Sequence, residues 1–169
     1  MSDMKKRWIS LFVENEIGVL ARVSSLYSSK SYNIESLTVG TTEDPTISRM
    51  TISMVSDDKT FEQIKKQLNR AVEVIKVVDY TDIPLHMREI LFIKVNHCTK
   101  QDKDEIDRIS RIFDVDIIDY NLNAMLLQCT QTESKNDALI KLMKDNFPNR
   151  VEITRGGVVA VEAIGIAER

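Results

Sequence analysis

The sequence of 169 residues lacks long apolar runs, closely spaced cysteines and an excess of basic residues. No apolar run approaches the roughly 20 residues that a membrane-spanning helix needs. Residues 1–7 lack the apolar stretch of a signal peptide, so we expect a cytoplasmic protein. The net charge of -3 argues against a dedicated nucleic-acid-binding surface, which usually carries a basic excess. Cys98 and Cys129 do not form a C-x-x-C pair, so the sequence does not indicate a structural zinc site.

Motifs typical of enzymes are also missing. The sequence contains no G-x-x-x-x-G-K-S/T phosphate loop, no G-x-S-x-G nucleophile turn and no H-E-x-x-H zinc motif. The most reactive-looking pair, His97-Cys98, is interpreted as the end of a strand entering a loop. The acidic residues between 102 and 107 suit the first turn of a helix, where they complement the helix dipole. We therefore expect no catalytic residue, metal ligand or cofactor in this chain.

What the first half does contain is a regular succession of strand and helix patterns. Alternating or valine-rich apolar segments predict strands at 8–13, 34–41, 48–56 and 72–80. Apolar residues at helical spacing predict one helix from Val19 to near Lys30. They predict a second helix after Asp57 and Asp58, both good N-cap candidates. The resulting order, β-α-β-β-α-β, is that of the ferredoxin-like fold.

The same order recurs in the second half. Strand patterns lie at 90–95, 115–120, 125–130 and 151–153, with 158–161 as an extension of the sheet, and helix patterns lie at 106–113 and 139–147. We therefore predict the α+β class with two tandem ferredoxin-like βαββαβ domains: 1–81, a linker at 82–88, and 89–169. Because open sheet edges are usually paired or covered, we also expect two copies to join edge to edge as a homodimer.

The loop between the first strand and the first helix is the candidate binding site. Gly18 allows a ligand to approach the backbone, and the free N–H groups of the helix start suit a carboxylate. Asn15 can both donate and accept hydrogen bonds, and Asn33 precedes the second strand. The complete candidate set is Asn15, Ile17, Gly18, Val19, Leu20, Asn33 and Ile34.

Purely structural roles remain open for the polar members of this set. Asn15 could be an N-cap, Gly18 a tight turn, and Asn33 a left-handed residue at a helix end. An acylphosphatase-like enzyme would need an arginine in this loop to hold phosphate. Here the loop is flanked by acidic residues, and Arg22 lies a full turn inside the helix.

Several strings resemble one protein family closely. L-F-V-E-N-E-I-G-V-L-A-R-V at 11–23 and Y-N-I-E-S-L-T-V at 32–39 are similar to the acetolactate synthase (acetohydroxyacid synthase) small subunits. So are T-E-D-P at 42–45 and S-R-M-T-I at 48–52, while the match thins in the second half. The resemblance implies that residues 1–81 form an ACT domain.

Members of that family are non-catalytic regulatory subunits. The resemblance implies a larger catalytic partner that carries thiamine diphosphate, magnesium and FAD. It also implies stimulation of that partner and feedback inhibition by valine in branched-chain amino-acid synthesis. The effector site would lie between paired ACT domains and use Asn15, Gly18 and Asn33. Val19, Leu20 and Ile34 would lie beside them, and Ile17 stands where the family often has proline. The alternative is a free-standing amino-acid-sensing ACT protein that controls another enzyme or a transcription factor.

Overall fold

The computed structural model of the protein describes residues 3–29 and 32–164. Its contacts divide the chain into two units. The first unit contains the residues up to His86 together with those from Val158 onward, and the second is Met87–Gly157. Each unit has its own antiparallel sheet and its own pair of helices, so the predicted α+β class and the two ferredoxin-like units are confirmed.

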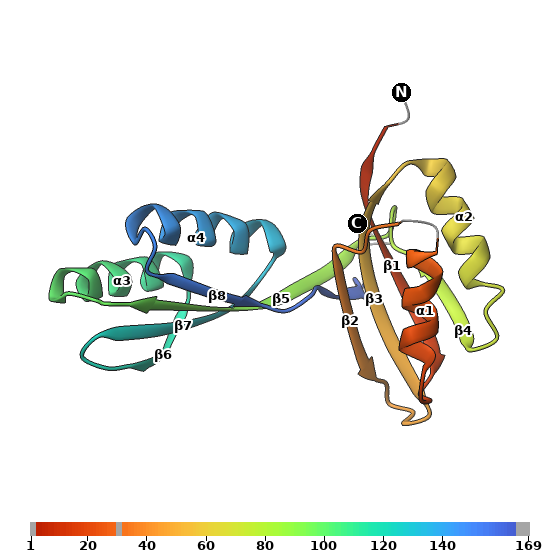
Figure 1. Ribbon diagram of the computed structural model, residues 1–169, viewed down its shortest axis with the longest axis horizontal. Helices are drawn as coiled ribbons and strands as arrows, with labels where there is room; N and C mark the ends of the chain where they lie inside the picture. Colours follow the sequence, from red (N-terminus) through yellow and green to blue (C-terminus); the bar gives the residue numbers. More distant parts are fainter. Residues whose placement is uncertain (1–2, 30–31, 165–169) are drawn as a thin grey trace. The chain divides into compact units, whose positions relative to one another are not determined.

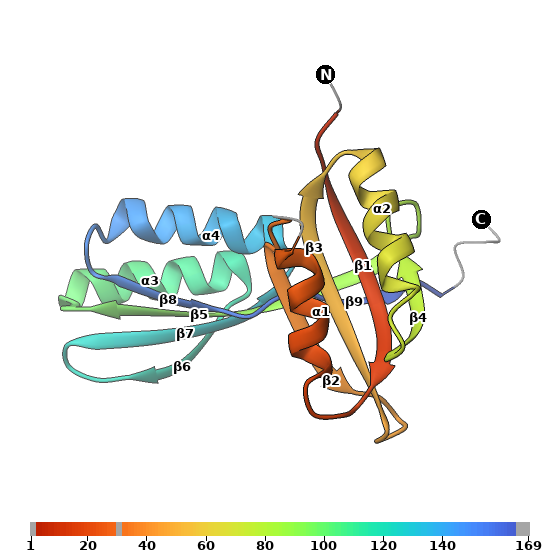
Figure 2. The same ribbon diagram turned by 45° about the vertical axis from the view of Figure 1, so that its right-hand side comes forward.

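The first unit has the strand order β2-β3-β1-β4. Its elements are β1 (Lys5–Glu14), α1 (Val19–Ser28), β2 (Ser36–Thr41), β3 (Ile47–Ser56), α2 (Asp58–Leu68) and β4 (Val74–Asp79). Both helices lie on one face of the sheet (Figures 1 and 2). Since β1 and β2 are each antiparallel to β3, they run parallel to each other, and β2 is an edge strand.

The core of the first unit follows from the alternation along β1. Ile9, Leu11 and Val13 are fully buried, because successive strand side chains point to opposite faces and these three face the helices. Burying one such side chain stabilises the fold by about 1.5–3 kcal/mol. The helix that covers them begins where expected: the Asp57 side chain accepts a hydrogen bond from Thr60 N at 2.7 Å.

The second unit has the strand order β6-β7-β5-β8. Its elements are β5 (Leu85–Asn96), α3 (Lys100–Phe113), β6 (Asp116–Tyr120), β7 (Ala124–Gln131), α4 (Glu133–Asn146) and β8 (Val151–Arg155). Both helices again lie on one face of their sheet (Figure 1). The acidic residues at the start of α3 include Asp102, which forms a reciprocal capping box with Thr99. The interpretation of this cluster as a helix start is therefore confirmed.

Two boundaries differ from the sequence-based expectation. The structure begins β5 at Leu85, inside the segment expected as a linker. α1 is described as far as Ser28, and Lys30, near which its end was expected, lies outside the described residues. The last strand, β9 (Val159–Glu162), pairs with β5, but its contacts place it in the first unit rather than in a domain that spans 89–169. The residues from Val158 onward thus come back to the first unit. Pro84 helps to hold them there, because its carbonyl accepts a hydrogen bond from Ala163 N at 2.9 Å.

The returning segment covers the helix-free face of the first sheet. Thr38, on β2, donates its hydroxyl proton to the carbonyl of Val158 at 2.9 Å, and the side chain of Ala160 is buried. Thr38 faces away from the helices, because it stands in register with Thr51 and, through it, with Ser10. Side chains 158 and 160 therefore point inward by the period of a strand.

Candidate functional site

Asn15 ties the candidate loop to the turn between β2 and β3. Its backbone N–H donates to Thr46 O at 2.7 Å, and its side-chain Nδ2 donates to Pro45 O at 2.9 Å. Its Oδ1 accepts a hydrogen bond from Ser48 Oγ at 3.0 Å. Asn15 is therefore not an N-cap, and that structural alternative is wrong. The sequence offered no signal for these partners, because they come from a turn thirty residues away.

Gly18 starts α1 with its backbone in the left-handed region, at φ 89°. An L-amino acid with a side chain is strained in that region, so glycine is needed here. No side chain caps this helix and no acidic residue lies in its first turn, whereas Asp57 and Thr99 cap α2 and α3. The partial positive charge of the α1 start is therefore left available to an anionic group.

The apolar candidates in this loop have different exposures. Ile17 is 100% exposed and Leu20 is 42% exposed, so both present apolar surface at the start of α1. Val19 is only 2% exposed and belongs to the core of the first unit. Within one chain, Ile17 and Leu20 are therefore available for contact and Val19 is not.

Asn33 and Ile34 lie at the opposite end of the sheet. They precede β2, whereas Asn15 follows β1, and the two strands run parallel. At about 3.3 Å per residue, the six residues of β2 alone separate the two ends by about 20 Å. Asn33 is exposed and does not have a positive φ, so its proposed role as a left-handed residue is wrong. The structure therefore does not bring Asn15 and Asn33 together within one chain.

Arg22 does not make the loop a phosphate site. Its guanidinium forms an ion pair with Glu73, in the turn before β4. It also passes close to Gly18, because a Cβ added there would lie 3.7 Å from an Arg22 nitrogen. The charge of this arginine is already neutralised, which disfavours the acylphosphatase-like alternative.

The described residues hold no group of three or more side chains placed to ligate a metal ion. Cys98 and Cys129 are both buried, and burial raises the pKa of each thiol, so neither resembles an activated nucleophile. His97 follows the end of β5 with φ 55°, and its carbonyl accepts a hydrogen bond from Arg150 at 3.0 Å. Within the same described part of the chain, no helix is long and apolar enough to span a membrane.

These features define a class of protein: two tandem ferredoxin-like units, the first of which has an uncapped helix start at Gly18. Residues 9–76 match the family of AHAS small subunit-like ACT domains, and residues 88–164 match the family described as the small subunit of acetolactate synthase. The chain belongs to the acetolactate synthase small-subunit family, as its resemblance to those proteins indicated. Membership of that family implies a non-catalytic, regulatory role.

Relatives and a solved structure agree with this assignment. The chain is 41% identical over 156 residues to the acetolactate synthase isozyme 3 small subunit of Escherichia coli K12, covering 92% of this chain and 94% of that one. It is 41% identical over 159 residues to the Aquifex aeolicus small subunit, covering 94% and 82%. The crystal structure of the Thermotoga maritima small subunit superposes with a TM-score of 0.85 at 36% identity, covering 96% and 99%.

Proposed function

We propose that this protein stimulates a catalytic acetolactate synthase large subunit and makes it subject to feedback inhibition by valine. The observation that carries the proposal is the start of α1, where an uncapped helix terminus follows Gly18, three residues after Asn15. Family membership over both halves of the chain supports a large catalytic subunit as the partner. The reaction itself would take place on the large subunit, with its thiamine diphosphate, magnesium and FAD, in the cytoplasm.

The α1 start suits the carboxylate of an amino acid. A negative group at a helix N-terminus gains about 0.3–1 kcal/mol when exposed and up to about 2 kcal/mol when partly buried. Asn15 Nδ2 has two protons and uses one on Pro45 O, so a second remains to orient a ligand. Ile17 and Leu20 offer exposed apolar contacts for a short aliphatic side chain.

A second copy of the chain would complete the site. β2 is an edge strand whose outer backbone groups have no strand partner among the described residues. If two copies pair antiparallel along β2, the beginning of one β2 lies next to the end of the other. Asn33 and Ile34 of one copy would then approach the Asn15–Gly18 loop of its partner. This supports a homodimer with the effector at the interface, and in that arrangement Val19 would support the loop from the core.

Valine would act by favouring one arrangement of the pair. A ligand shifts an equilibrium only by its difference in affinity for the two states. A coupling of about 1–3 kcal/mol between the effector site and the catalytic partner is enough for a 5–150-fold effect. We propose no contact between valine and the large subunit.

The deciding experiment measures acetolactate formation by the large subunit of the same organism, with and without this chain, across a valine titration. We expect the chain to raise the rate and valine to reverse that increase. Asn33→Ala should abolish the response to valine and keep the stimulation, because Asn33 is exposed on the loop before β2. Asn146→Ala, an exposed change on α4, is the matched control and should leave both properties unchanged.

Asn15→Ala alone is ambiguous, because Asn15 also holds the loop. Ser48→Ala resolves this: it removes a hydrogen bond to Asn15 Oδ1 but leaves the Asn15 amide in place. Loss of valine sensitivity in Asn15→Ala, with sensitivity retained in Ser48→Ala, supports direct contact with the effector. A large subunit whose rate is unaffected by this chain at every valine concentration would exclude the proposed partner and favour an amino-acid sensor with another target.

A further inference from the structure

A cavity of about 270 Å³ lies on the helix-free face of the first sheet, toward the end of β2. Gly40 and Arg49 both line it and stand opposite each other in the β2–β3 register. They share the helix-free face with Thr38 and Thr51, which are paired two residues away along the same strands. The lining residues from β9 belong to the same unit. The volume is just below the usual range of small-molecule sites, about 300–1,000 Å³, so a ligand here must be small.

The guanidinium of Arg49 is held in place along one edge. Its Nε donates to Ser10 Oγ at 3.0 Å, and its Nη2 donates to the hydroxyl of Tyr80. Its Cζ also lies 5.1 Å from the centre of the Phe12 ring, a cation–π contact. Ser10 on β1 and Tyr80 just after β4 lie on the side of β3 that is away from β2. Because a guanidinium is a rigid planar fork, the opposite edge, which carries Nη1, is turned toward β2 and the cavity.

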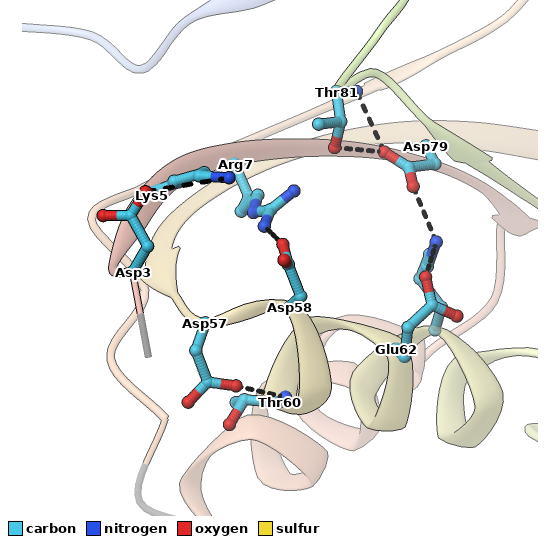
Figure 3. Close-up of polar contacts among 10 residues, drawn as sticks. Asp3, Lys5, Arg7, Asp57, Asp58, Thr60, Glu62, Asp79 and Thr81 are labelled. Atoms are coloured by element: carbon cyan, nitrogen blue, oxygen red, sulfur yellow. Dashed lines mark hydrogen bonds and ion pairs between the residues drawn. The ribbon is translucent and has the colours of Figure 1, made fainter. Parts of the chain in front are cut away.

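The charge of Arg49 has no carboxylate partner among the described residues. Two other arginines of the described chain are buried or half-buried, and each forms an ion pair. Arg7 is paired with Asp58 (Figure 3), and Arg150 is paired with Asp102 at 2.8 Å. Withdrawing a charge from water without a partner costs free energy. An anion at the free edge of Arg49 would supply the missing partner.

Thr51 adds an unpaired hydroxyl to the same wall. The residue is only 4% exposed, and its side chain has no hydrogen-bond partner among the described residues. Neither this hydroxyl nor Arg49 Nη1 is among the described polar atoms that are both unpaired and sealed from solvent. Both are therefore accessible, and the cavity that both residues line is where a ligand would meet them. Two donors on one face of one strand, one of them charged, suit the oxygens of a carboxylate.

The rest of the lining selects the kind of anion. Arg49 is the one charged side chain among the described lining residues, so one negative charge is matched better than the two of a phosphate. Val39, Val159 and Val161 also line the cavity, and each is between 49% and 62% exposed. Apolar surface of this kind at the rim favours a short aliphatic group, which loses contact with water when it binds.

We propose that this cavity binds a small aliphatic monocarboxylate. The carboxylate accepts hydrogen bonds from Arg49 Nη1 and from the Thr51 hydroxyl, and the aliphatic part lies against the valines of the rim. This inference goes beyond the proposed function and does not rest on it, because one chain supplies every described lining residue and the large subunit supplies none. The cavity shares no residue with the proposed effector site, so each site can be removed without the other.

The test titrates the isolated full chain with sodium isobutyrate at pH 7 and constant ionic strength, and follows the backbone amides by two-dimensional NMR. We expect saturable shifts at residues 38–41, 49–51 and 159–161. Isobutyramide, which has the same shape without the charge, should bind at least tenfold more weakly, because the pairing with a charged group is lost. Sodium acetate, two carbons shorter, should bind several-fold more weakly, because it buries less apolar surface.

Substitutions locate the site. Gly40→Val should abolish binding by filling the cavity, because no described atom lies within 4 Å of a Cβ added there. Thr51→Val removes the hydroxyl without unpairing another group and should weaken binding several-fold. Arg49→Gln should weaken it at least tenfold. Lys76→Gln is the matched control and should bind normally, because Lys76 also contacts the Phe12 ring, at 5.8 Å, but does not line the cavity.

Several results would overturn the proposal: absence of saturable binding, equal binding of isobutyramide, or retained affinity in Gly40→Val or Arg49→Gln. If Arg49→Gln fails to fold because Ser10 and Tyr80 lose a partner, Gly40→Val and Thr51→Val decide. Saturable shifts confined to residues 15–20 would also overturn it, because they would place the carboxylate at the start of α1. That last result would support the proposed effector site, so the two proposals fail separately.

Discussion

Removing Arg155 should destabilise the second unit far more than its partial exposure suggests. Its guanidinium donates two hydrogen bonds to the carboxylate of Glu89, from Nε at 2.6 Å and from Nη2 at 3.1 Å. The Glu89 side chain is only 3% exposed, and Asn136 Nδ2 donates to the same carboxylate at 3.2 Å. Arg155→Met would leave a buried carboxylate with one neutral partner. Breaking a buried pair in this way costs about 3–5 kcal/mol.

The partners of the pair should not be equivalent. Arg155 keeps a second carboxylate, Asp137 at 2.9 Å, and its side chain is 35% exposed. Glu89→Met therefore leaves a charge that still has a partner and can reach water, so we expect a smaller loss, about 1–3 kcal/mol. The double variant Glu89→Met/Arg155→Met should recover much of the loss of Arg155→Met, because no buried charge remains.

Urea unfolding followed by far-UV circular dichroism measures these differences. The fluorescence of Trp8, the single tryptophan of the sequence, reports separately on the first unit. The matched control is Lys94→Met, because Lys94 and Glu152 form an exposed pair at 3.5 Å between the same two strands. That pair should contribute at most about 1 kcal/mol. If Arg155→Met costs no more than this control, the reasoning about the buried carboxylate is wrong.

Three further results are expected. Gly18→Ala should lower the free energy of unfolding by about 1–2 kcal/mol in thermal denaturation, because the backbone is left-handed there, whereas Gly40→Ala, where φ is not positive, should change it little. The hydrogen bond from Arg150 is the main cause that lowers the pKa of Asp102, so this contribution to stability is present above the ordinary carboxyl pKa of about 4 and is lost as the pH falls below it. Asp102→Asn should flatten that part of a pH series of urea midpoints. Both buried cysteines should resist iodoacetamide at pH 8 in the folded chain and react in urea, as mass spectrometry would show; rapid modification of the folded chain would contradict their raised pKa values.

Periodicity was sufficient to predict the order of strands and helices, because in the central strands of both sheets every second side chain is apolar and faces the helices. It also predicted the cap at Asp57, whose effect is local. Periodicity could not predict that Val158 and Ala160 pack on the first unit. Alternation indicates that a segment is a strand, but it does not indicate which sheet the segment covers. The tight turn that the sequence offered as one role for Gly18 is confirmed by its positive φ, whereas binding at this loop stays a prediction.

The partners of the loop could not be predicted. Asn15 has the same local pattern whether it caps α1 or reaches the turn at Pro45, and only the tertiary structure distinguishes these roles. Ser56 likewise looks like any strand serine in the sequence. Its Oγ has no hydrogen-bond partner in the part of the chain that the structure describes, and this depends on the elements around it rather than on its neighbours along the chain.

The parallel course of β1 and β2 explains why the proposed effector site should be shared. It places Asn15 and Asn33 about 20 Å apart, farther than one valine can span, while antiparallel pairing of two β2 edges reverses one copy and brings opposite ends together. A ligand bound at such a junction contacts both copies, so its binding free energy depends directly on their arrangement. A site contained in one copy would have no such dependence. Under the proposed function, regulation by a small amino acid would therefore need no long-range path through the core of this domain; it would need only that the large subunit distinguish two arrangements of the pair.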